Sequence, residues 1–159
     1  MDKHLDSLVE RLAEALRARG AMMATAESCT GGLIAGTCTA ISGSSDWFDR
    51  AFVTYSNRAK TEMLGVPAPL IEQHGAVSQE VANAMAAGAR ERAGVSYAAA
   101  VTGIAGPTGG SDAKPVGTVW FGWATPAGTF TECRRFDGDR AAVRQQTVAH
   151  ALQGLLDRL

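Results

Sequence analysis

Helix-like and strand-like segments alternate along the chain, and this order constrains the fold more than any other feature of the sequence. Residues 3–19 place apolar side chains at helical spacing, and Gly20 follows as a helix stop. The apolar run from Ala21 to Ala26 then suits a buried strand, and residues 31–36 resume a helix-compatible spacing. A strand that leads directly into a helix is typical of an α/β fold.

The rest of the chain extends the alternation and ends in a hairpin and a helix. Residues 48–55 are aromatic and β-branched enough for a strand, and Ser56 or Asn57 could cap a following helix that Gly65 stops. The further expected elements are a helix over 79–93, a buried strand over 97–101, a hairpin of strands over 117–124 and 129–136, and a last helix after Asp139. We therefore predict one domain over residues 1–159, folded as a three-layer α/β/α sandwich with a mixed sheet.

Composition and charge suit a globular cytoplasmic protein. The chain is 46% hydrophobic and 19% charged, and its 15 basic residues nearly cancel its 16 acidic ones, so we expect no nucleic-acid partner. Charges interrupt the first twenty residues, and no apolar run approaches the roughly 20 residues that span a bilayer, so neither export nor a membrane partner is expected. The three cysteines lack CxxC spacing, so we expect no metal and no disulfide framework.

A hydroxyl stands at the first turn from an expected strand into an expected helix. Ligands collect at such loops in open α/β sheets, because the carboxyl ends of the strands converge there. Here Ser28 leads into a helix whose free N–H groups, near Thr30, Gly31 and Gly32, could hold an oxyanion or a phosphate. A serine at this position is also a common N-cap, and that reading stays open on these residues alone.

Two further polar loops follow expected strands. One runs from Tyr55 to Lys60, and the other, rich in glycine, follows Thr102 and contains Gly103 and Gly106. Its glycines would let backbone amides approach a ligand closely. This third loop lacks the Gly-Lys-Ser/Thr ending of a Walker A sequence, so a monophosphate suits it better than ATP.

A serine nucleophile needs a base, and the chain has only three histidines, two of them in the terminal helices. A lysine can serve if its pKa falls by about three units, which costs about 4 kcal/mol. Lys60 could meet that demand, and Tyr55 could face the same cleft beside Ser28. On residues alone, a lysine such as Lys60 is usually a solvated surface residue, and Tyr55 is as well explained as a packing residue. Cys29 is the second candidate nucleophile, although a buried thiol is its commoner role.

Six segments in order carry a family resemblance: TAESCTGG (25–32), VTYSNRAK (53–60), HGAVS (74–78), TGIAGPTGG (102–110), KPVGTVW (114–120) and GDRAAVRQQ (138–146). In these segments the chain resembles the CinA C-terminal domain family. The likeness covers essentially the whole chain. The chain is similar to the family's stand-alone amidohydrolases rather than to the longer members, which carry an additional N-terminal domain.

The resemblance implies a reaction and the residues that perform it. Family members with this activity hydrolyse the carboxamide of a small nucleotide, nicotinamide mononucleotide, to nicotinic acid mononucleotide and ammonia, which recycles pyridine nucleotides without a metal or organic cofactor. The motif positions fall on Ser28 as nucleophile, Lys60 as its base and Tyr55 as a second proton carrier. The resemblance also implies a homodimer.

Substrate phosphate needs cations or amides, and the last expected helix supplies two candidates. Arg140 and Arg144 lie four residues apart on one face, where either could bind phosphate or simply face solvent. Trp47, Phe48 and Trp120 could stack on a pyridine ring, although core packing is their commoner use. Two other functions stay open: a non-catalytic nucleotide-binding or regulatory module linked to competence and DNA damage, and an amidase for another carboxamide.

Overall fold

One five-stranded sheet organises residues 2–159, which the computed structural model describes. The strand order is β2-β1-β3-β4-β5. Their bounds are β1 Met23–Glu27, β2 Phe48–Val53, β3 Tyr97–Gly103, β4 Thr118–Thr125 and β5 Gly128–Arg135. Strands β2, β1 and β3 are parallel, whereas β4 and β5 form an antiparallel hairpin on β3, so the predicted mixed sheet is confirmed.

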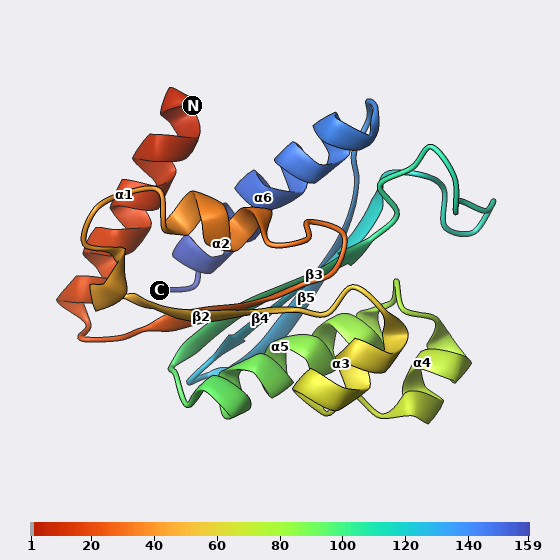
Figure 1. Ribbon diagram of the computed structural model, residues 1–159, viewed down its shortest axis with the longest axis horizontal. Helices are drawn as coiled ribbons and strands as arrows, with labels where there is room; N and C mark the ends of the chain where they lie inside the picture. The colour runs from red at the N-terminus through yellow and green to blue at the C-terminus, as the bar shows by residue number, and fades with distance from the viewer. Residues whose placement is uncertain (1) are drawn as a thin grey trace.

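Helices cover both faces of the sheet, which confirms the three-layer α/β/α prediction (Figure 1). One face carries α1 Lys3–Ala18, α2 Leu33–Cys38 and α6 Arg140–Leu156. The other carries α3 Asn57–Leu64, α4 Ala68–His74 and α5 Gln79–Ala93. A short 3₁₀ turn, Ser44–Asp46, precedes β2. None of the helices within residues 2–159 is both long and apolar enough to cross a membrane.

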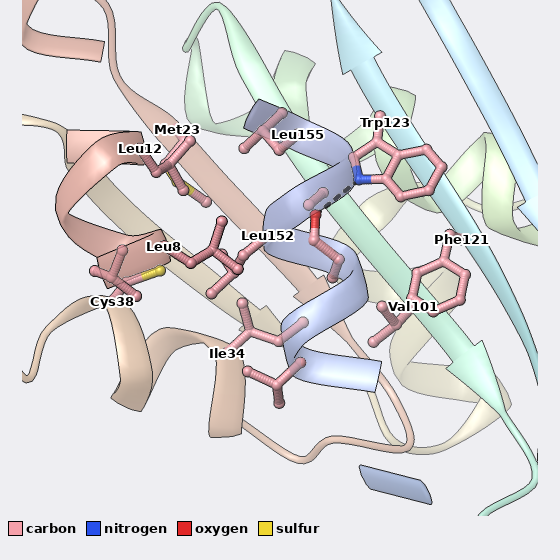
Figure 2. Packing of buried hydrophobic residues seen from close by; sticks show 14 of the residues in the cluster. Leu8, Leu12, Met23, Ile34, Cys38, Val101, Phe121, Trp123, Leu152 and Leu155 are labelled. Carbon is pink, nitrogen blue, oxygen red and sulfur yellow. Dashed lines mark hydrogen bonds between the residues drawn. The ribbon is translucent and has the colours of Figure 1, made fainter. Parts of the chain in front are cut away.

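The larger core lies between the sheet and the layer of α1, α2 and α6. Leu8 and Leu12 of α1 meet Leu152 and Leu155 of α6 above the sheet (Figure 2). Each fully buried leucine contributes about 1.5–3 kcal/mol relative to exposure. The indole N–H of Trp123 donates to the Ala151 carbonyl at 2.9 Å, which satisfies its polar atom inside the core.

Helix ends follow the signals that the sequence offered. Ser56 caps α3 by accepting from the Ala59 amide at 3.0 Å, and Gly65 ends that helix with a positive φ of 73°. Asp139 caps α6 in the same way. One helix was not predicted: α4 fits seven residues between Pro67 and Gly75, too short for its apolar spacing to stand out.

Candidate active site

The site forms where three parallel strands end side by side. Glu27 pairs in register with Val53 of β2 and with Val101 of β3, so the residues that follow these strands leave the sheet at one edge. The Ser28 amide donates to the Val101 carbonyl at 3.1 Å, and the Thr54 amide donates to the Glu27 carbonyl at 2.8 Å. This edge is the usual ligand site of an open α/β sheet.

Ser28 and Lys60 are both buried, and their side chains meet. The amine nitrogen Nζ of Lys60 lies 3.1 Å from Ser28 Oγ, and Lys60 is 1% exposed. Lys60 comes from the first turn of α3, whose N-cap Ser56 fixes the helix start. Burial disfavours the charged amine and lowers the pKa of Lys60 from its ordinary value, with Cys29 acting weakly in the opposite sense.

Two backbone carbonyls complete the surroundings of the Lys60 amine. Nζ lies 3.0 Å from the Thr54 oxygen and 3.2 Å from the Tyr55 oxygen. A neutral amine can donate its two hydrogens to these carbonyls and accept the Ser28 hydroxyl proton, whereas an ammonium can donate to all three oxygens. Lys60 can therefore take and return a proton without losing a hydrogen bond.

Tyr55 contributes to the pair through its backbone rather than its hydroxyl. Its carbonyl accepts from Lys60 and lies 3.4 Å from Ser28 Oγ. Its side chain is 63% exposed, and its hydroxyl lies 3.5 Å from a guanidinium nitrogen of Arg140. The structure thus brings the Tyr55 ring to the mouth of the site but not its hydroxyl to the Ser28 and Lys60 pair.

A cavity of about 320 Å³ opens above the pair, a size within the range of small-molecule sites. Of the residues predicted from sequence, Ser28, Tyr55, Lys60, Thr102, Gly103, Gly106 and Arg140 line it. The Thr102 hydroxyl is already engaged, since it donates to the Ala76 carbonyl at 2.9 Å. Arg140 donates to the Gly106 carbonyl at 2.9 Å, which ties α6 to the glycine-rich loop.

The N-terminus of α2 is not the open anion site that the sequence suggested. Thr30, Gly31 and Gly32 do not line the cavity, and Thr30 is fully buried. The Gly32 amide donates to the Glu27 carboxylate at 3.2 Å, so the protein's own acid occupies the place expected for an oxyanion or phosphate. The cavity wall is thus built from other residues, and direct substrate binding by these three stays a prediction.

Arg144 also faces away from the cavity. It donates to the Cys29 carbonyl at 3.1 Å and to the Thr30 carbonyl at 3.2 Å, and it does not line the cavity. These bonds use its guanidinium to hold the turn after Ser28. The two arginines that the sequence could not distinguish thus have different places, and only Arg140 reaches the cavity.

Alternative nucleophiles and bases have unsuitable surroundings. Burial is the main cause that raises the pKa of the Cys29 thiol to about 12, which leaves it protonated at neutral pH. No histidine lines the cavity, and neither do Trp47, Phe48 or Trp120. Within residues 2–159, no group of three or more His, Cys, Asp and Glu side chains is placed to hold a metal ion.

Comparisons with known proteins show which family the chain belongs to. A sequence model of the CinA C-terminal domain matches residues 5–159. The chain belongs to the CinA C-terminal domain family. It is 57% identical over 152 residues to the nicotinamide-nucleotide amidohydrolase PncC of Pseudomonas putida, covering 96% of this chain and 95% of that protein. The PncC of Escherichia coli K12 is 55% identical, with 97% and 94% covered.

Solved structures of CinA proteins share the fold over the same length. The competence/damage inducible protein CihA of Agrobacterium tumefaciens superposes with a TM-score of 0.95 at 45% identity, covering 99% of this chain and 96% of that one. A CinA-superfamily protein of Escherichia coli gives a TM-score of 0.95 at 37% identity, with 100% and 94% covered. The CinA fold therefore extends over the cavity and all the strands that position it.

Sequence reasoning missed several residues of this CinA site. Asn57, Ala76, Val77 and Thr108 line the cavity. Each lies inside a family motif, so the motifs were the available signal, but none carries chemistry that stands out by residue type. Glu27 was also overlooked, although a carboxylate directly before a serine and a helix start is a signal for helix capping.

Proposed function

We propose that this protein hydrolyses the carboxamide of nicotinamide mononucleotide to nicotinic acid mononucleotide and ammonia, returning the ring to the pyridine nucleotide pool. The observation that carries the proposal is the contact between buried Lys60 and Ser28 at the base of a cavity that Arg140 also lines. The names of relatives above 50% identity support the substrate. The amine and hydroxyl supply the nucleophile and base that amide hydrolysis requires.

In the first half-reaction, the neutral Lys60 amine accepts the Ser28 proton while Oγ bonds to the carboxamide carbon. The resulting oxyanion binds the Cys29 N–H, which directly follows the nucleophile and donates to no backbone carbonyl among residues 2–159. Lys60 then returns the proton to the amide nitrogen. The carbon–nitrogen bond breaks, ammonia leaves, and an ester joins the nicotinoyl group to Ser28.

In the second half-reaction, a water molecule attacks the ester carbon and gives its proton to Lys60. The bond to Ser28 Oγ breaks, and Lys60 returns the proton to that oxygen. The product leaves as a carboxylic acid, which ionises in water. Lys60 performs both steps because it is the group that contacts Ser28, whereas the Tyr55 hydroxyl lies beside Arg140.

Arg140 is the proposed phosphate contact. Lys60 and Arg140 are the only basic side chains on the cavity wall within the described chain, and Lys60 is engaged with Ser28. A guanidinium can hold a phosphate with two parallel hydrogen bonds. The nucleotide would then lie with its carboxamide at Ser28 and its 5′-phosphate near the start of α6.

Ammonia release from nicotinamide mononucleotide by Ser28→Ala and Lys60→Met tests the proposal. Both variants should lose at least about a thousandfold in kcat, because neither retains both nucleophile and base. The wild-type kcat/KM should rise with pH through the lowered pKa of Lys60, because only the neutral amine accepts the proton. Exposed Ser42→Ala and Lys3→Met serve as matched controls with wild-type rates. Undiminished turnover in Ser28→Ala would exclude the mechanism.

One observation favours a second candidate, an amidase for another carboxamide. Apart from the exposed Tyr55, no aromatic side chain of the described residues lines the cavity, so few side chains there could recognise a pyridine ring by stacking. A panel of nicotinamide, its riboside, its mononucleotide and simple carboxamides separates the two. Equal kcat/KM across the panel would support the broader amidase. Nucleotide that raises the melting temperature without ammonia release would instead indicate a binding module.

A further inference from the structure

Glu27 is a fully buried acid next to the nucleophile for which the proposed reaction has no step. It is the last residue of β1, and its side chain is 0% exposed. A carboxylate in such a place is costly unless it is hydrogen-bonded throughout. Its surroundings therefore indicate what it does.

Five donors surround the Glu27 carboxylate. One oxygen accepts from the Thr30 hydroxyl at 2.7 Å and from the Gly32 and Ile34 amides at 3.2 and 2.9 Å. The other accepts from the Thr25 hydroxyl at 3.0 Å and from the Ala35 amide at 2.9 Å. Four of these donors belong to the turn after Ser28 and to the first residues of α2.

We propose that Glu27 is a positioning residue that holds the Ser28 turn so that Oγ stays within reach of Lys60. The turn from Ser28 to Thr30 is fixed at both sides: Glu27 binds it from within the core, and Arg144 binds the Cys29 and Thr30 carbonyls from α6. Lys60 is fixed separately, by the Thr54 and Tyr55 carbonyls. Movement of the turn would therefore lengthen the 3.1 Å contact between Ser28 and Lys60.

A carboxylate is required at this position because all its neighbours donate. An ionised acid accepts at both oxygens, whereas an amide has one oxygen and one NH₂ group. In Glu27→Gln, the NH₂ group would face a backbone N–H whichever way the amide turned, since Ile34 and Ala35 donate to different oxygens. The chain of contacts from β1 to α2 would break at that point.

None of the five donors to the Glu27 carboxylate comes from the glycine-rich loop, Thr102 or Arg140. The glycine-rich loop and Arg140 are tied to each other, and Thr102 is tied to Ala76. Loss of a contact between Glu27 and the turn that carries Ser28 should therefore lower kcat and leave KM nearly unchanged. This inference rests on the proposed role of Ser28 as nucleophile, and it adds the group that keeps that serine in place.

A matched pair of variants tests the inference with less disruption than a change of Glu27 itself. Thr30→Val and Thr25→Val each remove one hydroxyl donor from the carboxylate, and both threonines are 0% exposed. Only Thr30 lies in the nucleophile's turn, whereas Thr25 lies in the middle of β1. Thr30→Val should lower kcat about tenfold with KM within about twofold, while Thr25→Val keeps kcat within about twofold. Both should lower Tm by a similar few degrees.

A second readout separates this inference from the choice of substrate. An arylsulfonyl fluoride labels a nucleophilic serine whatever amide the enzyme cleaves, and intact mass spectrometry follows the rate at Ser28. Thr30→Val should label about tenfold more slowly than Thr25→Val. If the two variants label at these different rates but the wild type releases no ammonia from nicotinamide mononucleotide, the proposed substrate is wrong and the positioning role of Glu27 stands. Equal kcat and equal labelling in the two variants, or a change confined to KM, would overturn the positioning role.

Discussion

At the scale of residues, Arg140 and Arg144 lie one helical turn apart and make different contacts. Arg140 points to the cavity mouth, where it meets Gly106 and the Tyr55 hydroxyl. Arg144, one turn later on α6, donates to the carbonyls of Cys29 and Thr30 beneath the cavity. The same residue type thus lines the cavity at one position and supports the turn after Ser28 at the next.

Arg140→Met should raise the KM for nicotinamide mononucleotide about 10–100-fold, because a charge-assisted contact to phosphate is lost. The KM for nicotinamide riboside, which lacks the phosphate, should change less than about threefold. Steady-state ammonia assays on both substrates measure this difference. Arg11→Met, an exposed position on α1, is the control for the loss of one charge. Equal loss on both substrates would contradict a phosphate contact.

Ser28 could be predicted from its local sequence, whereas the environment of Lys60 could not. A hydroxyl between a strand and a helix is visible in the order of residues 23–38. The burial of Lys60 depends on the Thr54 and Tyr55 carbonyls and on how α3 packs, which are tertiary features. Glu27 was missed although its five partners all lie between residues 25 and 35, because their hydroxyls and amides converge on one carboxylate only when β1 and α2 are folded.

At the scale of elements, α6 packs on the sheet through a glycine. A Cβ atom at Gly154 would lie 2.5 Å from Cε2 of Trp123, and the Trp123 ring is fully buried. The indole N–H reaches the Ala151 carbonyl one turn earlier on the same helix. Close approach of α6 to β4 therefore depends on the missing side chain.

Gly154→Ala should destabilise the protein by about 1–3 kcal/mol, because overpacking a rigid core exceeds the gain in helix propensity of about 1 kcal/mol. Gly36→Ala in α2 is the matched control, since nothing lies within 4 Å of its added Cβ. That variant should be unchanged or more stable by about 0.5 kcal/mol. Urea unfolding of both variants measures the difference. Equal stability of the two would refute the packing argument.

The element boundaries show which signals in the sequence sufficed. A cap and a glycine stop predicted α3, and α6 was expected to begin after Asp139, since such signals act within one turn of chain. The strand expected over residues 48–55 ends earlier, at Val53, because the Thr54 and Tyr55 carbonyls turn toward Lys60 instead of pairing with a strand. That shortening is a consequence of the site rather than of local propensity.

At the scale of the whole molecule, the fold keeps an amine in an environment that disfavours its charge. The unfolded chain exposes Lys60 with its ordinary pKa of 10.5, and folding lowers that pKa, mainly through burial. Between the lowered pKa and 10.5, the unfolded chain binds a proton that the native protein does not. The free energy of unfolding therefore falls as the pH drops from 10.5 through this window, and it is constant below the lowered pKa as far as Lys60 is concerned.

Lys60→Met removes this titration, so the wild type should lose stability relative to the variant as the pH falls from about 10 toward neutrality, by about 1.4 kcal/mol for each unit of the pKa shift. Urea unfolding at a series of pH values gives the difference in free energy of unfolding between the wild type and the variant at each pH. In this difference the titrations of all other groups cancel. For Lys3→Met, which alters an exposed lysine, the difference in free energy of unfolding from the wild type should not change with pH. If the difference in free energy of unfolding between the wild type and Lys60→Met is also independent of pH, folding leaves the Lys60 amine charged. The base of the proposed reaction would then be missing.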